Sequence, residues 1–525
     1  MNAPPEMPAS PAMPDQPPAQ ATSRYLERLL LAAALASAVV FIAVGIERPV
    51  WLDEANSVLI ASRGFTAIPD SLSRDNNLPC YYFLLSLWMR IFGDSEIALR
   101  SLSALFYLGG CGVTFRLGRR LARNHRAACY SAFFYASSAL AIRQAQNIRM
   151  YSLLGVLAGL SILAFVRVFR DGDSSWRARG LFFAVNTLGL LTHVWFVFVL
   201  AAQFVAVLIF ERQRAWRFAL AAAPCGASFV AVWGSRFIAQ LQNGATDWMP
   251  RLSAALAVQA ALEFYLPITT PALYMLAAAS WIRATPETRR HVARGKGVAL
   301  LLVISAVSLA VPLLVSTVRP IYWPGRYAII VCVPLAALLG TLLTSTLRRP
   351  LLAGLCLAIL LLQTGVHIQG RELAPDAQLP PGQSDRATAQ FLLTHAAAGD
   401  VVVFTSLSRA AADYYLRRAH AASRFVEISF PAEVATHLGW IDGTVSPVRQ
   451  VSLQDEAAAE TLRIHRLADS GAHIWVYDGS TPKVSRILRD RLDQTLTLRR
   501  EFSLEGPYHQ RLLEYARPTP SPAFR

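Results

Sequence analysis

Residues 48–57 read RPVWLDEANS, and they follow directly on the first long apolar run of the chain, residues 27–46. The adjacent carboxylates of Asp53 and Glu54 therefore stand at the point where a helix leaves a membrane. Acidic side chains are unfavourable at such a boundary unless they serve a function. This pair is a candidate reaction centre, and its surroundings depend on how the other apolar runs cross the bilayer.

The composition indicates a polytopic membrane protein. Hydrophobic residues make up 54% of the 525 residues and occur in long runs that arginine-rich loops separate, which is unlike an ordinary soluble domain. The runs suitable as spans are residues 27–46, 97–117, 127–145, 150–168, 180–193, 194–211, 217–239, 269–283, 297–318, 326–347 and 351–368. The sequence therefore predicts an α-helical membrane protein with about 11 transmembrane helices.

Charge in the loops predicts the orientation of these helices. Every second loop is rich in arginine, and such loops stay in the cytoplasm. Residues 78–92 are apolar but too short for a span, and counting them as one would break this alternation. We therefore expect residues 54–63 and 78–92 to form helices at the outer surface. The N-terminus is then cytoplasmic, whereas Asp53 and the C-terminus lie outside the membrane.

The two ends of the chain differ from its apolar middle. Residues 1–22 are rich in Pro, Ala and Gln, which is typical of a disordered tail. Residues 23–369 hold the predicted transmembrane domain, and residues 370–525 predict a small periplasmic α/β domain. Its predicted elements are helices at 386–398, 408–419 and 483–495 and strands at 401–404, 473–477, 497–503 and 510–515. Since its sequence has no Gly-rich phosphate loop, we interpret this domain as a lid or a docking platform.

Two features of the composition are not functional signals. The net charge of +16 comes from arginines in short loops, and no basic stripe with interleaved aromatic residues indicates a nucleic-acid partner. The six cysteines lie within or beside apolar runs, and no pair has the spacing of metal ligands. We expect them to be small buried residues rather than disulfide partners or ligands.

The carboxylate of Asp53 has three interpretations. It could accept a proton from a hydroxyl that attacks a sugar carbon. It could equally help to hold a divalent cation, Mg²⁺ or Mn²⁺. The structural alternative is that Asp53 and Glu54 only cap the N-terminus of the helix predicted at 54–63. Because neighbouring residues of a helix point about 100° apart, the two carboxylates need not share one role.

Several polar residues fall in the outer loops beside this pair. Arg100, Arg149 and Arg326 stand at outer helix ends, where an arginine either snorkels to lipid headgroups or binds a lipid phosphate. His193 at the end of a short apolar run is either a ligand or a packing residue. Asn77 could bind sugar hydroxyls or merely interrupt the chain.

The ordered series of these motifs resembles the C-type integral-membrane glycosyltransferases, in particular the bacterial branch near the protein O-mannosyltransferases of glycosyltransferase family 39 and the lipid A aminoarabinose transferases. The resemblance covers most of the chain after the tail. Its motifs are Trp51-Leu52-Asp53-Glu54-Ala55, Leu78-Pro79-Cys80-Tyr81-Tyr82, residues 92–101, Gln146, Arg149-Met150-Tyr151-Ser152-Leu153, Thr192-His193, Gly325-Arg326-Tyr327 and Gly399-Asp400-Val401-Val402.

The resemblance implies a polyprenyl-phosphate-sugar donor in a cavity that opens to the periplasm from the bacterial inner membrane. It implies catalysis by Asp53 with Glu54 beside it, and single displacement that inverts the anomeric carbon. The arginines implied to bind the donor phosphate are Arg100, Arg149 and Arg326. The residues implied to bind substrate are Asn77, Tyr82, Gln146, Tyr151, His193 and Tyr327.

This chain departs from the family pattern at three positions. Asn77 stands where the family often has His or Lys, and Asn147 stands where it often has Glu. The second departure removes an acid that could share a metal with Asp53, so no metal ligands are assigned and a divalent cation stays an open alternative. Aminoarabinose transferases carry Arg where this chain has Asn56, which argues against that sugar.

The predicted function is transfer of a hexosyl or pentosyl group from a lipid-phosphate donor to a periplasmic glycan, lipid or protein. One alternative is a transporter or flippase for lipid-linked glycans, which would need polar residues inside its spans. The other is a non-enzymatic protein of envelope assembly, which would tolerate the loss of Asp53. The donor sugar and the acceptor stay undetermined at this point.

Overall fold

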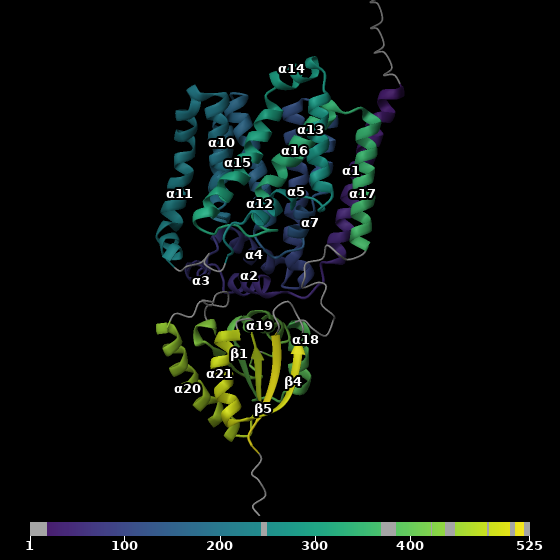
Figure 1. Cartoon of the computed structure of the whole chain (residues 1–525). Coiled ribbons are helices and arrows are strands. Elements are labelled where there is room, and N and C mark those ends of the chain that lie inside the picture. Colours follow the sequence, from purple (N-terminus) through teal and green to yellow (C-terminus); the bar gives the residue numbers. More distant parts are fainter. Residues whose placement is uncertain are drawn as a thin grey trace, which may run out of the picture.

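The computed structural model describes residues 18–242, 249–368, 385–421, 423–435, 447–479, 482–504 and 510–518. A helical bundle forms one layer, and an α/β domain lies against one end of it (Figure 1). Residues 1–17 of the predicted tail lie outside the described residues. Residues 18–22 were wrongly assigned to that tail, because helix α1 already begins at Pro18.

Each predicted apolar run coincides with a helix of the bundle. The run at 127–145 is divided into two helices, because the chain turns at Ser137 and Ser138. The bundle helices are α1 (Pro18–Val44), α5 (Glu96–Ala122), α6 (His125–Ala136), α7 (Ala139–Ala145), α8 (Tyr151–Phe165), α9 (Trp176–Thr192), α10 (Phe196–Phe210), α11 (Ala215–Gln242), α12 (Ala254–Leu262), α13 (Thr269–Arg283), α14 (Pro286–Arg294), α15 (Gly297–Val318), α16 (Ile329–Thr346) and α17 (Arg349–Ile368). Short helical turns η1 (Val166–Arg170) and η2 (Arg212–Arg214) continue α8 and precede α11. Within the described ranges, 7 helices are long and apolar enough to cross a membrane, so a membrane location is confirmed while the count of about 11 stays a prediction.

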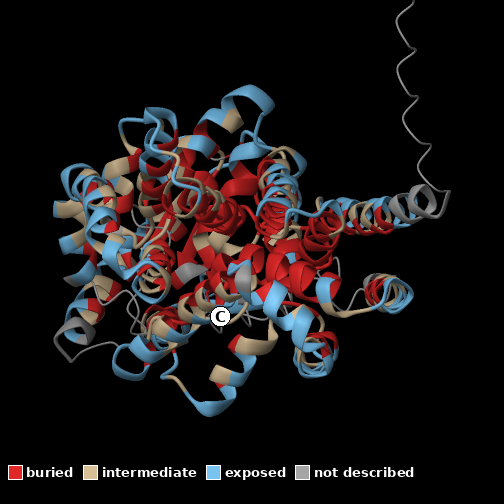
Figure 2. Ribbon diagram, turned by 90° about the horizontal axis from the view of Figure 1, so that it is seen from above, coloured by how far each residue is buried: buried red, intermediate tan, exposed pale blue. Residues whose placement is uncertain are grey.

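Helix α16 forms the centre of the bundle. It is buried from Ile329 to Thr344 and packs against α5, α6, α8, α13 and α15. Gly340 allows the closest approach, since a Cβ atom there would lie 2.4 Å from the backbone nitrogen of Ser131. Small residues serve this purpose in membrane helices, where backbones must pack closely. Buried residues accordingly gather in the middle of the bundle when it is seen from above (Figure 2).

Three short helices lie at the end of the bundle that faces the α/β domain (Figure 1). They are α2 (Leu52–Ser62), α3 (Ile68–Arg74) and α4 (Pro79–Phe92). Proline at the first position favours the start of α4, and Gly93, whose φ is 83°, ends it. The two helices expected at 54–63 and 78–92 are therefore present as α2 and α4, outside the set of candidate spans.

The C-terminal domain contains a five-stranded sheet. Its strands are β1 (Val401–Thr405), β2 (Val426–Phe430), β3 (Ile474–Asp478), β4 (Thr497–Leu504) and β5 (Gln510–Ala516), in the order β2-β1-β3-β5-β4. Strand β1 runs parallel to β2 and β3, whereas β5 runs antiparallel to β3 and β4. Its helices are α18 (Asp385–His395), α19 (Arg409–Arg418), α20 (Pro447–Asp469) and α21 (Pro482–Thr495), with short turns η4 (Ser406–Ser408) and η5 (Ala432–Ala435). The predicted elements are confirmed, while β2 and α20 were not predicted.

The two faces of this sheet have different neighbours, because side chains alternate along a strand. Val401 and Val403 pack under α20 and α21 in a core of their own. Val402 and Phe404 on the opposite face join α18 and α19 in an apolar core that continues into the membrane bundle. The α/β domain is therefore packed onto the bundle by one sheet face and by α19.

Candidate active site

The start of α2 places its two carboxylates in different surroundings. Glu54 is completely buried, whereas the side chain of Asp53 is 25% exposed. Neighbouring residues of a helix point about 100° apart. One side chain therefore points into the bundle and the other along its surface. The two acids are therefore considered separately.

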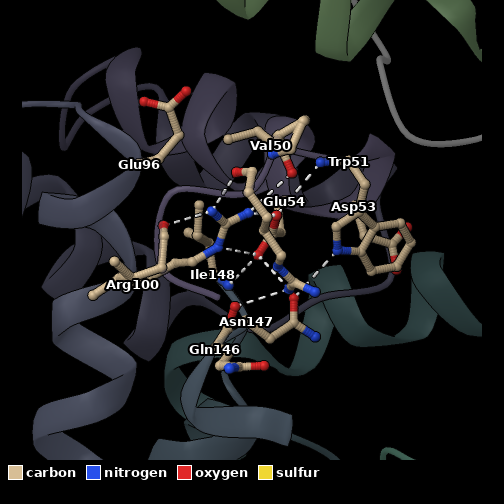
Figure 3. Close-up of polar contacts among 12 residues, drawn as sticks. Val50, Trp51, Asp53, Glu54, Glu96, Arg100, Gln146, Asn147 and Ile148 are labelled. Atoms are coloured by element: carbon tan, nitrogen blue, oxygen red, sulfur yellow. Dashed lines mark hydrogen bonds and ion pairs between the residues drawn. The ribbon is translucent and has the colours of Figure 1, made fainter. Parts of the chain in front are cut away.

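Glu54 lies at the centre of a buried network of donors (Figure 3). One carboxylate oxygen accepts from Arg100 Nε at 3.1 Å, from Arg48 at 3.2 Å and from the Ile148 backbone N–H at 3.0 Å. The other accepts from Arg100 Nη2 at 2.5 Å and from the Trp51 backbone N–H at 3.4 Å. Burial alone would raise the pKa of the Glu54 carboxyl, but Arg100 and Arg48 outweigh it and hold the pKa below its ordinary value.

These contacts contradict a catalytic role for Glu54. Both oxygens are engaged, and a group without exposure cannot reach a substrate. The carboxylate instead ties three segments together, because α2, the loop after α7 and the first turn of α5 all bond to it. Glu54 is therefore a buried anchor of the loop that carries Asp53.

Arg100 does not fit its predicted role as a phosphate ligand. It is completely buried, and all five of its N–H groups are used. Besides the bonds to Glu54, they donate to the backbone carbonyls of Ile46 at 2.9 Å, Arg48 at 2.6 Å and Pro49 at 3.1 Å. The sequence placed Arg100 at an outer helix end, but its face of α5 turns inward to Glu54 rather than outward to headgroups.

Asp53 forms an ion pair with Arg326, at 2.9 Å between Oδ2 and Nη1. The two side chains are 25% and 20% exposed, so the pair is partly open to solvent rather than in the core. The Arg326 guanidinium also lies 5.4 Å from the centre of the Trp51 ring. Residues 53 and 326, far apart in the sequence, are thus brought together as predicted for one site.

The turn that presents Arg326 is held by its neighbour Gly325. Its φ of 74° lies in the left-handed region that favours glycine. The Gly325 N–H donates to Glu263 at 2.5 Å, and its carbonyl accepts from Gln144 at 2.5 Å. Burial raises the pKa of the Glu263 carboxyl to about 7. Neither residue was assigned from the sequence, since an isolated acid or amide carries no motif.

Arg149 lies on the other side of Asp53. Its Nη1 donates to the Asp53 carbonyl at 3.2 Å and to Ser57 Oγ at 3.1 Å, and its Nη2 lies 3.4 Å from Asn77 Oδ1. Its Nε is buried and has no acceptor among the described residues. Of the three arginines implied to bind the donor phosphate, Arg149 and Arg326 both contact Asp53, whereas Arg100 contacts Glu54.

Three aromatic side chains lie close together beside these arginines. The centres of the Tyr151 and Tyr327 rings lie 6.0 Å apart, and His193 lies 5.9 Å from the first and 5.2 Å from the second. Trp195 stacks on Tyr327 at 5.0 Å. The three predicted substrate residues are thus grouped at the site.

The remaining predicted substrate residues divide into two groups. Asn77 contacts Arg149, and Tyr82 is completely buried beside it. Gln146 is buried elsewhere, since its amide donates to the Phe41 carbonyl at 2.8 Å and its own carbonyl accepts from Arg48. A substrate-binding role for Gln146 is therefore contradicted, because its polar groups join α1 to the loop after α7.

The residues around Asp53 do not fit a divalent cation. Over the described ranges, no three His, Cys, Asp or Glu residues come together. Asn147, which stands where an acid was expected, lies with Oδ1 3.4 Å from Trp51 Nε1. One carboxylate that is already paired with the guanidinium of Arg326 is a poor set of ligands for a hard cation, which prefers several oxygens.

One family model matches part of the chain. Residues 76–234 match a family model described as dolichyl-phosphate-mannose-protein mannosyltransferase. No curated protein matches the chain in sequence.

Solved structures share the fold over nearly the whole chain. ArnT from Cupriavidus metallidurans in the apo state has a TM-score of 0.59 at 14% identity, and the match covers 94% of this chain and 98% of that one. The same protein bound to undecaprenyl phosphate has a TM-score of 0.57 at 14% identity, with 92% and 97% covered. The apo oligosaccharyltransferase of Archaeoglobus fulgidus has a TM-score of 0.52 at 11% identity, with 95% and 75% covered. The predicted resemblance and its fold are confirmed.

Proposed function

We propose that this chain, a membrane glycosyltransferase of the C-type fold, transfers a sugar from a polyprenyl-phosphate donor to an acceptor outside the membrane, with Asp53 as the base. The observation that carries this proposal is the partly exposed carboxylate of Asp53, which pairs with Arg326 while Arg149 binds the backbone carbonyl of the same residue. Lipid phosphates are known in relatives of the same fold, as undecaprenyl phosphate in ArnT and dolichol-phosphate in the archaeal oligosaccharyltransferase AglB.

The two arginines suit a donor phosphate because they keep unused donors. Within the described part of the chain, the hydrogen bonds of Arg326 involve only Nη1, and its side chain is 20% exposed. Arg149 is 7% exposed, and its buried Nε has no acceptor among the described residues. Arg100, by contrast, has none to spare. Guanidinium groups with free N–H pairs recognise phosphate oxygens by charge-assisted bonds.

The chemistry follows from this arrangement. An acceptor hydroxyl attacks the anomeric carbon while Asp53 takes its proton. The bond from the anomeric carbon to the phosphate oxygen breaks, and its electron pair leaves with the lipid phosphate. Arg149 and Arg326 stabilise the negative charge that grows on this leaving group. One displacement inverts the configuration at the anomeric carbon.

The orientation of the bundle supports a site outside the cytoplasm. Helix α14, which carries three arginines, lies at the end of the bundle opposite to α2, α3 and α4 (Figure 1). Arginine-rich loops stay in the cytoplasm, so the Asp53 site and the α/β domain face the periplasm of a bacterial inner membrane. The sugar is a hexose or a pentose, and the acceptor a periplasmic glycan, lipid or protein.

The test uses purified protein in lipid nanodiscs with a panel of radiolabelled polyprenyl-phosphate sugars and envelope extracts as acceptors. Asp53→Asn should reduce turnover at least about 100-fold, because a positioned base contributes that much. Asp70→Asn is the matched control, since Asp70 lies on the neighbouring α3, pairs with Arg236 and is 82% exposed. Equal turnover in the Asp53 variant and the wild type would remove Asp53 as the base.

A further inference from the structure

Helix α19 of the C-terminal domain packs directly on α2, the helix that carries Asp53 (Figure 1). The buried side chains of Tyr414 and Tyr415 belong to the apolar core that α19 shares with α2. This contact connects the α/β domain with the catalytic helix itself rather than with a peripheral loop.

Two adjacent tyrosines of α19 reach the backbone of the membrane domain at different places. Tyr415 accepts a hydrogen bond from the Val50 N–H at 2.7 Å. Tyr414 donates to the Asp94 carbonyl at 2.8 Å, in the loop between α4 and α5. Val50 is 1% exposed and precedes Asp53 by three residues, so the first bond holds the entry to α2. The second holds a loop that does not contact Asp53.

Hydrogen bonds from both the bundle and the α/β domain hold residues 46–50, the segment before Asp53. From the bundle, Arg100 binds the carbonyls of Ile46, Arg48 and Pro49. From the α/β domain, Tyr415 binds the Val50 N–H and Arg386 donates to the Glu47 carbonyl at 2.6 Å. A buried backbone N–H needs an acceptor, and the domain supplies the one for Val50.

Polar bonds add to the apolar contact between the domain and the bundle. Glu96 receives Arg386 at 2.8 Å and also pairs with Arg418. A cavity of about 530 Å³ lies at this joint, lined among others by Glu47, Glu96, Arg386 and Tyr415. Since the joint is not closely packed throughout, these polar bonds help to fix the position of the segment before Asp53 relative to the domain.

We infer that the α/β domain positions the catalytic loop, with Tyr415 as the positioning residue that fixes the Val50–Asp53 turn. The domain sets where the Asp53 carboxylate stands relative to Arg326, although it supplies no group to the reaction. The effect on turnover rests on the proposed function. The hold on the loop, which is the fixing of the Val50–Asp53 turn by Tyr415, does not.

The experiment compares Tyr415→Phe with Tyr414→Phe in the full chain in nanodiscs. Each variant removes one hydroxyl of the same helix and keeps the ring. Amide hydrogen exchange over residues 46–56, read by mass spectrometry, should accelerate about tenfold in Tyr415→Phe and stay unchanged in Tyr414→Phe, because only the first loses the acceptor of Val50. Arg386→Gln, which loses the bond to Glu47, should accelerate exchange in the same segment.

Turnover is measured on the same samples. Tyr415→Phe should lower kcat about tenfold to 100-fold, the effect of a misplaced catalytic group. KM for the donor should change less than about twofold, because Arg149 and Arg326 belong to other segments of the chain than the turn that Tyr415 holds. Tyr414→Phe should keep the wild-type kcat. Equal exchange rates in Tyr415→Phe and Tyr414→Phe would overturn the positioning role. If Tyr415→Phe exchanges faster but the two variants have the same kcat, the effect of this positioning on catalysis is overturned. If exchange responds while the wild type transfers no sugar, the proposed function fails and the hold on the loop stands.

Discussion

Replacement of Glu54 by Gln should destabilise the protein strongly, in contrast to replacement of Asp53 by Asn. Glu54 is the buried counter-charge of Arg100 and Arg48, at 2.5 and 3.2 Å. A glutamine keeps one acceptor oxygen, but its NH2 group would face the N–H donors that now bind the second carboxylate oxygen. The buried cations Arg100 and Arg48 would then lose their counter-charge. Removing one member of a buried ion pair lowers the free energy of unfolding by about 3–5 kcal/mol.

The Asp53 pair is expected to behave differently. It is partly exposed, so its contribution to the free energy of unfolding is screened and amounts to about 0–1 kcal/mol. Thermal unfolding in detergent, followed by tryptophan fluorescence, measures both variants, and turnover is measured at a temperature where both are folded. Glu54→Gln should melt at a much lower temperature, whereas Asp53→Asn should melt near the wild type and be inactive.

The pH dependence gives an independent check of the Glu54 network. The pKa of Glu54 lies below its ordinary value in the folded protein, so its stabilisation is present above the unfolded pKa of 4.5 and disappears as the pH falls through the lower folded pKa. Glu54→Gln should lack this acid-sensitive part. A Glu54→Gln protein with wild-type stability and no turnover would refute the assignment as an anchor and restore a catalytic role.

Two further predictions concern the turn that carries Arg326. Arg326→Gln should raise KM for the donor about tenfold to 100-fold through loss of charge-assisted bonds to phosphate, whereas Arg236→Gln, outside the site, should not; equal KM in both would exclude Arg326 as a phosphate ligand. Burial raises the pKa of Glu263 to about 7. The same carboxyl in the unfolded chain loses its proton at a lower pH. The free energy of unfolding should therefore fall by at most about 3 kcal/mol as the pH rises from 4.5 to 7. Glu263→Gln should remove that decline in a series of thermal melts, and an unchanged decline would contradict the assignment.

Much of the architecture followed from local patterns. The apolar runs predicted the bundle helices because a span must be long and apolar whatever its neighbours. The shortness of residues 78–92 and the alternating arginine loops separated α4 from the spans. The strands of the C-terminal domain followed from runs such as Val401-Val402-Val403-Phe404. Strand β2 and helix α20 were not predicted, although their sequences are no more polar than those of β4 and α21, which were.

The sequence by itself determined the acid at the membrane boundary and two of its arginines, Arg149 and Arg326. Only the tertiary structure decided which of the two acids is buried and which is partly exposed. Asp53 and Glu54 are neighbours in the chain, but Glu54 receives Arg100 across 46 positions and Asp53 receives Arg326 across 273. Tyr415 reaches Val50 across 365 positions. Burial and charge pairing depend on such distant partners, so a local pattern can find the carboxylates but cannot show which one is buried.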